Sequence, residues 1–78
     1  SHSNLALALL QTGDPKGARE HFQKATDIYE RHIKTESYEY AAVTENFVEF
    51  LRQTGDEKAA LSLFKKAQKK LKKVELKV

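Results

Sequence analysis

Histidine is the residue type here most suited to binding a metal ion, and the chain has three, His2, His21 and His32. On a helix, the eleven positions between His21 and His32 would place them roughly 20° apart around the axis but about 16 Å apart along it. One metal ion cannot bridge that distance, and no HExxH-type spacing brings two imidazoles together. Cysteine is absent, which excludes a thiolate zinc site. We therefore predict no metal and no other cofactor, and interpret the histidines as partly exposed residues of helix faces.

Hydroxyl side chains could act as nucleophiles if a base lay beside them. Ser37, Thr44 and Ser62 have no neighbouring histidine in the sequence, and none follows the strand–turn–helix elbow of hydrolases. The three glycines are scattered and form no phosphate-binding loop. We therefore expect that the chain is not an enzyme.

Charged residues are the remaining candidates for function, and they are unevenly distributed. Residues 35–56 carry five acidic groups and one basic group, whereas residues 57–78 carry eight lysines against two glutamates. The lysines could contact nucleic acid or anionic lipid. The alternative, which we favour, is a solvated outer face, because no aromatic residue or arginine alternates with them as base stacking requires. The lysines of this candidate basic face are Lys65, Lys66, Lys69, Lys70 and Lys73.

Glycine and aspartate mark where the elements that position these residues begin and end. The segments TGDP (12–15) and TGDE (54–57) each offer a glycine that can end one helix at positive φ and an aspartate that can cap the next. A weaker break lies at KTES (34–37), where Thr35 or Ser37 could serve as the cap. These breaks predict four helices, over about 3–12, 15–33, 37–54 and 57–75.

Apolar residues recur every three or four positions in the last three of these segments, as on one buried face of a helix. No alternating pattern favours strands, so the predicted fold class is all-α. The predicted buried stripes are Ala18, Phe22, Ala25, Ile28 or Tyr29, and His32 or Ile33; then Tyr40, Val43, Phe47, Phe50 and Leu51; then Ala60, Leu61, Phe64, Ala67, Leu71 and Val74.

The sequence also repeats itself. The segment LLQTGDPKGAREHFQKA (9–25) is similar to LRQTGDEKAALSLFKKA (51–67), forty-two residues later. This repeat predicts two copies of an antiparallel helical hairpin. The recurring residues resemble the tetratricopeptide repeat, in which a small residue lets two helices approach and an aromatic residue one turn later fills the gap to the next helix. They are Leu5, Ala6, Leu9, Gly13, Ala18, Phe22 and Ala25 in the first copy, and Phe47, Val48, Leu51, Gly55, Ala60, Phe64 and Ala67 in the second.

The resemblance implies four helices stacked as a short right-handed superhelix in one domain, residues 1–78, with repeat one over about 1–34 and repeat two over about 37–75. The sequence departs from the family pattern at His2 and Thr44, where a large aromatic is common, and lacks the closing proline. Its spacing of 42 rather than about 34 residues resembles the repeats of kinesin light chains. Because about three repeats are usually needed for stability, we expect the chain to be a fragment of a longer array.

The resemblance also implies a non-catalytic scaffold that holds a peptide segment or partner protein in a concave groove lined by the first helix of each hairpin. The alternative function is electrostatic binding of nucleic acid or anionic membrane through the lysine-rich C-terminal helix. Asn4 and Asn46 occupy equivalent positions and could either clamp a ligand backbone or bond to neighbouring helices. The implied groove residues are Asn4, Leu7, Gln11, Glu45, Asn46, Glu49, Arg52 and Gln53.

The charge of this groove predicts the kind of partner. Glu45 and Glu49 are one helical turn apart and would repel the acidic C-terminal tails that chaperone-binding members of the family hold with Lys, Arg and Asn. We expect basic or neutral protein or peptide partners instead, with nucleic acid or membrane less favoured. The open ends of so short an array could also pair two copies of the chain.

The cellular location is predicted from two features of the sequence. No apolar run approaches the roughly 20 residues that span a bilayer. The lack of cysteine is compatible with a reducing compartment. A cytoplasmic, intracellular location is therefore expected.

Overall fold

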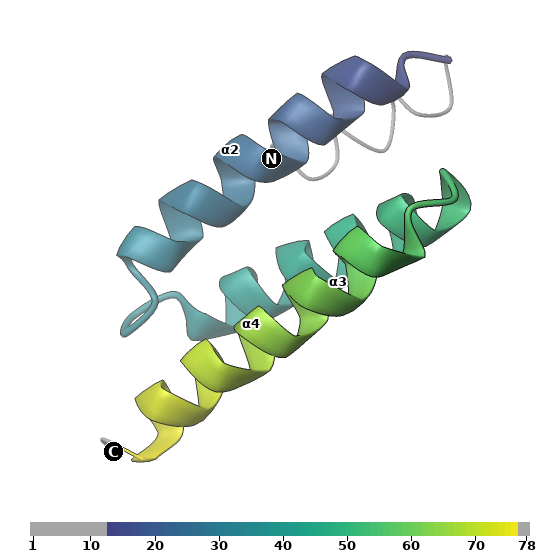
Figure 1. Ribbon diagram of the computed structural model, residues 1–78. Coiled ribbons are helices and arrows are strands. Elements are labelled where there is room, and N and C mark those ends of the chain that lie inside the picture. The colour runs from purple at the N-terminus through teal and green to yellow at the C-terminus, as the bar shows by residue number, and fades with distance from the viewer. Residues whose placement is uncertain (1–12, 77–78) are drawn as a thin grey trace.

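The structure is a computed structural model that describes residues 13–76. This part of the chain forms three helices. They are α2 (Pro15–Arg31), α3 (Ser37–Gln53) and α4 (Glu57–Leu76), and α3 runs antiparallel to the other two (Figure 1). The all-α prediction is confirmed. The predicted four helices are not all seen, because the described residues hold three and the expected helix over 3–12 lies outside them. The right-handed superhelix stays a prediction.

Two repeated glycine–aspartate pairs set the starts of α2 and α4, as the sequence predicts. Gly13 and Gly55 have φ values of +88° and +86°, a left-handed conformation that other residues rarely adopt. Each is followed by an aspartate, Asp14 or Asp56, whose Oδ1 accepts a hydrogen bond from the backbone N–H three residues later, at 3.0 and 3.2 Å. The local sequence alone therefore fixes these two helix starts.

The turn between α2 and α3 differs from expectation. Glu36, rather than Thr35 or Ser37, is the N-cap of α3, and its side chain makes no capping hydrogen bond. The Thr35 hydroxyl instead donates to the carbonyl of His32 at 3.3 Å. Since α2 ends at Arg31 with His32 as its C-cap, the predicted stripe does not extend along the helix to His32 or Ile33.

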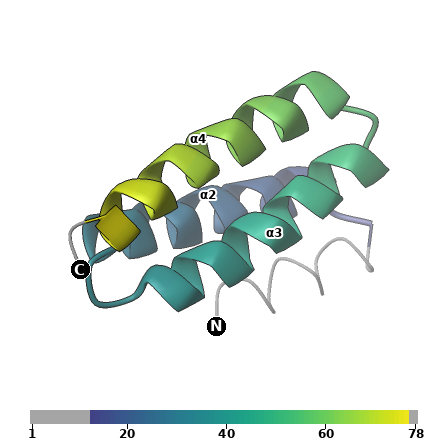
Figure 2. The same cartoon turned by 90° about the horizontal axis from the view of Figure 1, so that it is seen from below.

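The core lies where α3 packs against both neighbours, α2 on one side and α4 on the other. The view from below shows α3 and α4 side by side as a hairpin, with α2 crossing behind them (Figure 2). Side chains of all three helices meet there, and the rings of Phe22, Phe47 and Phe50 form its centre. The buried cluster consists of Ala18, Phe22, Ala25, Val43, Phe47, Val48, Phe50, Leu51 and Ala60.

Two residues of the predicted stripes lie at the surface instead. Leu61 and Phe64 are 52 and 44% exposed, because none of the described helices covers the flank on which they lie. Of the alternatives Ile28 and Tyr29, Tyr29 packs against the core and Ile28 is exposed. Two threonines that the apolar pattern passed over, Thr26 and Thr44, are buried. Thr26 is tolerated inside because its hydroxyl donates to the carbonyl of Gln23 at 3.0 Å.

Candidate functional site

A hollow of about 510 Å³ lies along the hairpin formed by α3 and α4. Its α4 wall is formed by Phe64, Ala67, Gln68 and Leu71, and Phe64 is partly exposed. A partly exposed aromatic ring beside aliphatic side chains is a surface that gains free energy when another apolar group covers it. This wall therefore favours contact with an apolar or aromatic group.

The α3 wall of the hollow changes from apolar at its base to charged at its rim. Val48 and Thr44 are buried at the base. Glu45, Glu49 and Arg52 are exposed and line the same hollow. Two carboxylates against one guanidinium leave this rim with a net negative charge at neutral pH. The hollow thus pairs an apolar wall with an acidic rim.

The structure places the predicted groove residues in three ways. Glu45, Asn46, Glu49 and Arg52 all line the hollow. Gln53 does not line it, and its side-chain amide donates to Glu49 Oε1 at 3.3 Å. The remaining three, Asn4, Leu7 and Gln11, lie outside the described residues. A binding role for the whole set stays a prediction.

Sequence reasoning missed that α4 contributes a wall to this site. It assigned the groove to the first helix of each hairpin alone, whereas Phe64, Gln68 and Leu71 come from the second. The signal in the sequence was the apolar flank of the last predicted helix, from Leu61 to Leu71, because no further predicted helix was left to cover it. Combining that flank with the charged positions of α3 would have located the hollow.

The predicted basic face of α4 is divided rather than continuous. Lys66 and Lys70 both reach across to Glu30 of α2, with Lys66 Nζ 3.9 Å from Glu30 Oε1 and Lys70 in closer contact with the same oxygen. Lys66 and Lys70 therefore lie along the edge of α4 nearest α2, and a role of the five lysines as one basic face stays a prediction. Lys65, Lys69 and Lys73 are exposed.

The contact with Glu30 changes the acidity of three side chains. The hydrogen bond from Lys70 lowers the pKa of the Glu30 carboxyl, and the same bond raises the pKa of Lys70. Tyr40 lies buried nearby on α3, and its pKa is raised first by burial and then by the negative charge of Glu30. The Glu30–Lys70 pair thus links α2 to α4, whereas the stacked rings of the core link α2 to α3.

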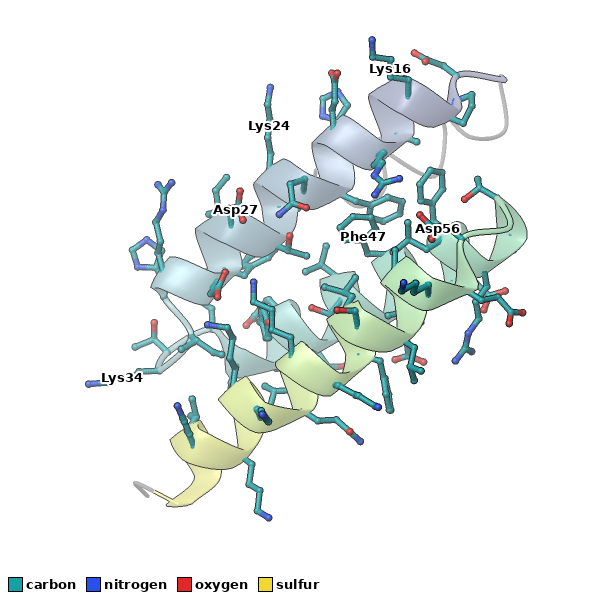
Figure 3. The ribbon with its side chains drawn as sticks, viewed as in Figure 1. Lys16, Lys24, Asp27, Lys34, Phe47 and Asp56 are labelled. Atoms are coloured by element: carbon teal, nitrogen blue, oxygen red, sulfur yellow. The ribbon has the colours of Figure 1, made fainter. Side chains whose placement is uncertain are left out.

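Charged side chains point outward from α2, whereas an aromatic ring lies between α2 and the α3–α4 hairpin. Phe47 lies between α2 and the α3–α4 hairpin, while Lys16 and Lys24 point from α2 away from the hairpin (Figure 3). Asp56, at the turn before α4, faces α2, where its Oδ2 is 3.7 Å from Nη1 of Arg19 (Figure 3). The outer side of α2 therefore carries exposed lysines, and α2 contributes no residue to the hollow.

His21 and His32, the two histidines among the described residues, do not meet at a common site. His21 is half-buried on α2, and His32 is exposed at the end of that helix. Within the described part of the chain, no three His, Cys, Asp or Glu side chains lie close enough to hold a metal ion together.

None of the helices in the described part of the chain has the length and apolar character needed to cross a bilayer.

Comparison with known proteins identifies the family. No curated protein and no solved structure gives a significant match to the chain. A family model described as tetratricopeptide repeat matches residues 1–73, nearly the whole sequence. The likeness to kinesin light chain spacing stays a prediction. Ala18, Ala60 and Phe22, the small and aromatic residues by which the sequence resembles that family, are buried in the structure, and the chain belongs to the tetratricopeptide repeat family.

Proposed function

We propose that this chain is a non-catalytic scaffold that binds a segment of another protein in the hollow between α3 and α4. Tetratricopeptide repeats generally mediate protein–protein interaction, and the family assignment supports that role here. The observation that carries the proposal is the hollow itself, which places the partly exposed ring of Phe64 opposite the rim carboxylates of Glu45 and Glu49.

The charge of the rim supports the partner preference that we propose, which is for basic or neutral segments. Glu45 and Glu49 face a bound segment with only Arg52 to offset them. Because these side chains are exposed, each charged contact contributes only about 0.2–1 kcal/mol, and salt weakens it further. An acidic tail would be repelled by this rim, whereas lysine or arginine side chains would be attracted to it.

Binding of nucleic acid or membrane through α4 has less support. Two of its five candidate lysines, Lys66 and Lys70, are paired with Glu30 and would have to leave that carboxylate to bind a phosphate. Within residues 13–76, α4 also presents no arginine, which nucleic-acid surfaces commonly use for stacking and bidentate contacts. We therefore place the function in the hollow.

Titration with matched peptides tests the proposal. Two fluorescent 15-residue peptides with the same apolar residues, one rich in lysine and one rich in glutamate, are compared by anisotropy. We expect the lysine peptide to bind at least tenfold more tightly, and the double variant Glu45→Lys/Glu49→Lys to reverse that order. The matched control Lys69→Glu/Lys73→Glu changes two charges on the outer face of α4 and is expected to preserve the order. Micromolar binding of an acidic C-terminal peptide would refute the charge preference.

A further inference from the structure

The repeated sequence supplies an internal template for what the hollow accepts. A shift of forty-two positions carries the inner face of α2 onto α4, matching Phe22 with Phe64 and Ala25 with Ala67. Phe22 is fully buried, whereas Phe64 is 44% exposed. The two copies therefore offer the same kind of surface, and in the described structure one is covered and the other is open.

The covered copy shows what fits such a surface. A helix, α3, lies over Phe22 and presents two aromatic rings three residues apart. Phe47 stacks on Phe22 with centroids 5.3 Å apart and planes 6° apart, and Phe50 meets the same ring at 5.3 Å with a tilt of 39°. A pair of aromatics spaced i and i+3 on one helix face is therefore what packs against this buried phenylalanine.

The partly exposed surface around Phe64 differs from the covered surface around Phe22 in having negative charge beside it. Among the described residues, no aromatic ring stacks on Phe64. The opposite rim of its hollow carries Glu45 and Glu49. A helix lying in the hollow would present one edge to the apolar α4 wall and the other to these carboxylates, so basic residues on the second edge would complement them.

Resting on the proposed function, we propose that the hollow receives an amphipathic helix of another polypeptide. Two aromatic side chains three residues apart on its apolar face cover Phe64, and lysine or arginine on the adjoining face meets Glu45 and Glu49. Such a helix binds by its helical anchors rather than as an extended strand of backbone.

A peptide derived from the template tests this. The probe is a fluorescent peptide of residues 37–54 carrying Glu45→Lys and Glu49→Lys, which keeps the two phenylalanines and makes the adjoining face basic. We expect saturable binding to the full 78-residue chain. Replacing both peptide phenylalanines by alanine, or the peptide's threonine 44 by proline to break the helix, is expected to weaken binding at least tenfold.

Two variants of the protein locate the binding. Phe64→Ala removes the ring at the centre of the hollow and is expected to weaken binding at least tenfold. Tyr38→Ala removes an aromatic that is 82% exposed and does not line the hollow, and is expected to leave binding unchanged. Circular dichroism checks that both variants keep the helical content of the parent chain. Binding that survives Phe64→Ala in full overturns the inference.

The remaining outcomes separate this inference from the proposed function. If the proline peptide binds as tightly as the helical one and both need Phe64, the occupant is an extended segment; the helix inference then fails while the binding function stands. If the chain alone sediments as a dimer that Phe64→Ala dissociates, the occupant is a second copy and the inference is wrong. If no peptide binds and the chain is a monomer, the inference is overturned, and the charge-matched titration decides the function separately.

Discussion

The rings of Phe22 and Phe47 stack almost parallel, with centroids 5.3 Å apart and planes 6° apart. Phe22 belongs to α2 and Phe47 to α3, so the stack joins two helices that the sequence separates by a turn without glycine or proline. Both rings are buried, and the tilted ring of Phe50 closes the group. This contact is part of the buried cluster that attaches α2 to the α3–α4 hairpin.

Loss of the Phe22 ring is therefore expected to destabilise the chain severely. Phe22→Ala should lower the free energy of unfolding by about 3–5 kcal/mol, because it removes a fully buried ring and leaves a cavity. Domains of this size have about 5 kcal/mol or little more to lose, so the variant is expected to be largely unfolded. Urea denaturation followed by circular dichroism at 222 nm measures the change.

Two further variants keep this prediction measurable. Phe22→Leu retains most of the volume and should leave a folded protein with a lower midpoint. Phe64→Ala is the matched control, since it removes the same ring at the equivalent but exposed position and should cost less than about 1 kcal/mol. Equal losses for Phe22→Ala and Phe64→Ala would contradict the account of which ring is covered.

The starts of α2 and α4 could be predicted from sequence because their signals are local. Gly55 and Asp56 act within one turn of where they lie, so the residue types suffice to place the helix start. The start of α3 near residue 37 was also predicted, but its N-cap was not, because Glu36 caps that helix without a side-chain hydrogen bond and no residue type signals such a cap. The cap residue was predicted where its side chain bonds the first turn of the helix, and was missed where the backbone alone forms the cap.

The candidate site was only partly predictable, for a different reason. Phe22 and Phe64 occupy equivalent positions in the two sequence copies, so the pattern predicts burial for both. Burial depends on whether another helix lies over the ring, and that is a property of the assembled structure. Likewise, Lys70 meets Glu30 only because of how α4 is rotated about its own axis, and helical periodicity does not predict that rotation accurately enough.

Removal of the Asp56 side chain is expected to destabilise the start of α4. Asp56→Ala should cost about 1 kcal/mol, because the N–H of Ala59 loses the carboxylate that accepts its hydrogen bond at 3.2 Å. The same carboxylate is 3.7 Å from Arg19, so thermal or urea denaturation of Asp56→Ala alone does not separate the two contacts.

The control for the capping prediction is Arg19→Gln, which removes the ion pair and keeps the cap. Both partners are well exposed, so this change should cost less than about 0.5 kcal/mol. Asp56→Asn keeps an oxygen that can accept from the helix N-terminus and should recover most of the loss. A larger loss for Arg19→Gln than for Asp56→Ala would show that the ion pair, and not the cap, stabilises this turn.

The ion pair between Glu30 and Lys70 should stabilise the chain at neutral pH and less at the extremes. Because the hydrogen bond from Lys70 lowers the pKa of Glu30 below 4.5, its stabilisation is fully present above that value and is lost as pH falls through the lower folded pKa. Because the pKa of Lys70 is raised above 10.5, its share is present below that value and lost as pH rises through the higher folded pKa.

Lys70→Gln is therefore expected to lower the free energy of unfolding by about 0.5 kcal/mol at pH 7, as is usual for a partly exposed pair. The difference from the parent chain should shrink below pH 4. Lys69→Gln, at a neighbouring exposed position, is the matched control and should change stability by less. Urea denaturation at several pH values gives both curves; a constant difference between parent and Lys70→Gln from pH 3 to pH 7 would contradict the pairing.

The single positive charge on the rim of the hollow should weaken the binding of basic segments. Arg52 lines the hollow beside Glu49 and offsets part of its charge. Arg52→Gln is therefore expected to tighten binding of the lysine-rich peptide about two- to fivefold at low salt. The gain should disappear as the ionic strength rises, since screening at 0.5 M salt shortens the range of exposed charges to a few ångströms.

Arg31→Gln serves as the control for this prediction, because it removes one positive charge from the end of α2, which contributes no residue to the hollow. It changes the net charge of the chain by the same amount, so it tests whether the local rim or the overall charge governs the affinity. Anisotropy titrations of both variants at 20, 150 and 500 mM salt provide the comparison. An equal gain from Arg31→Gln would place the effect in the overall field of the protein and argue against binding in the hollow.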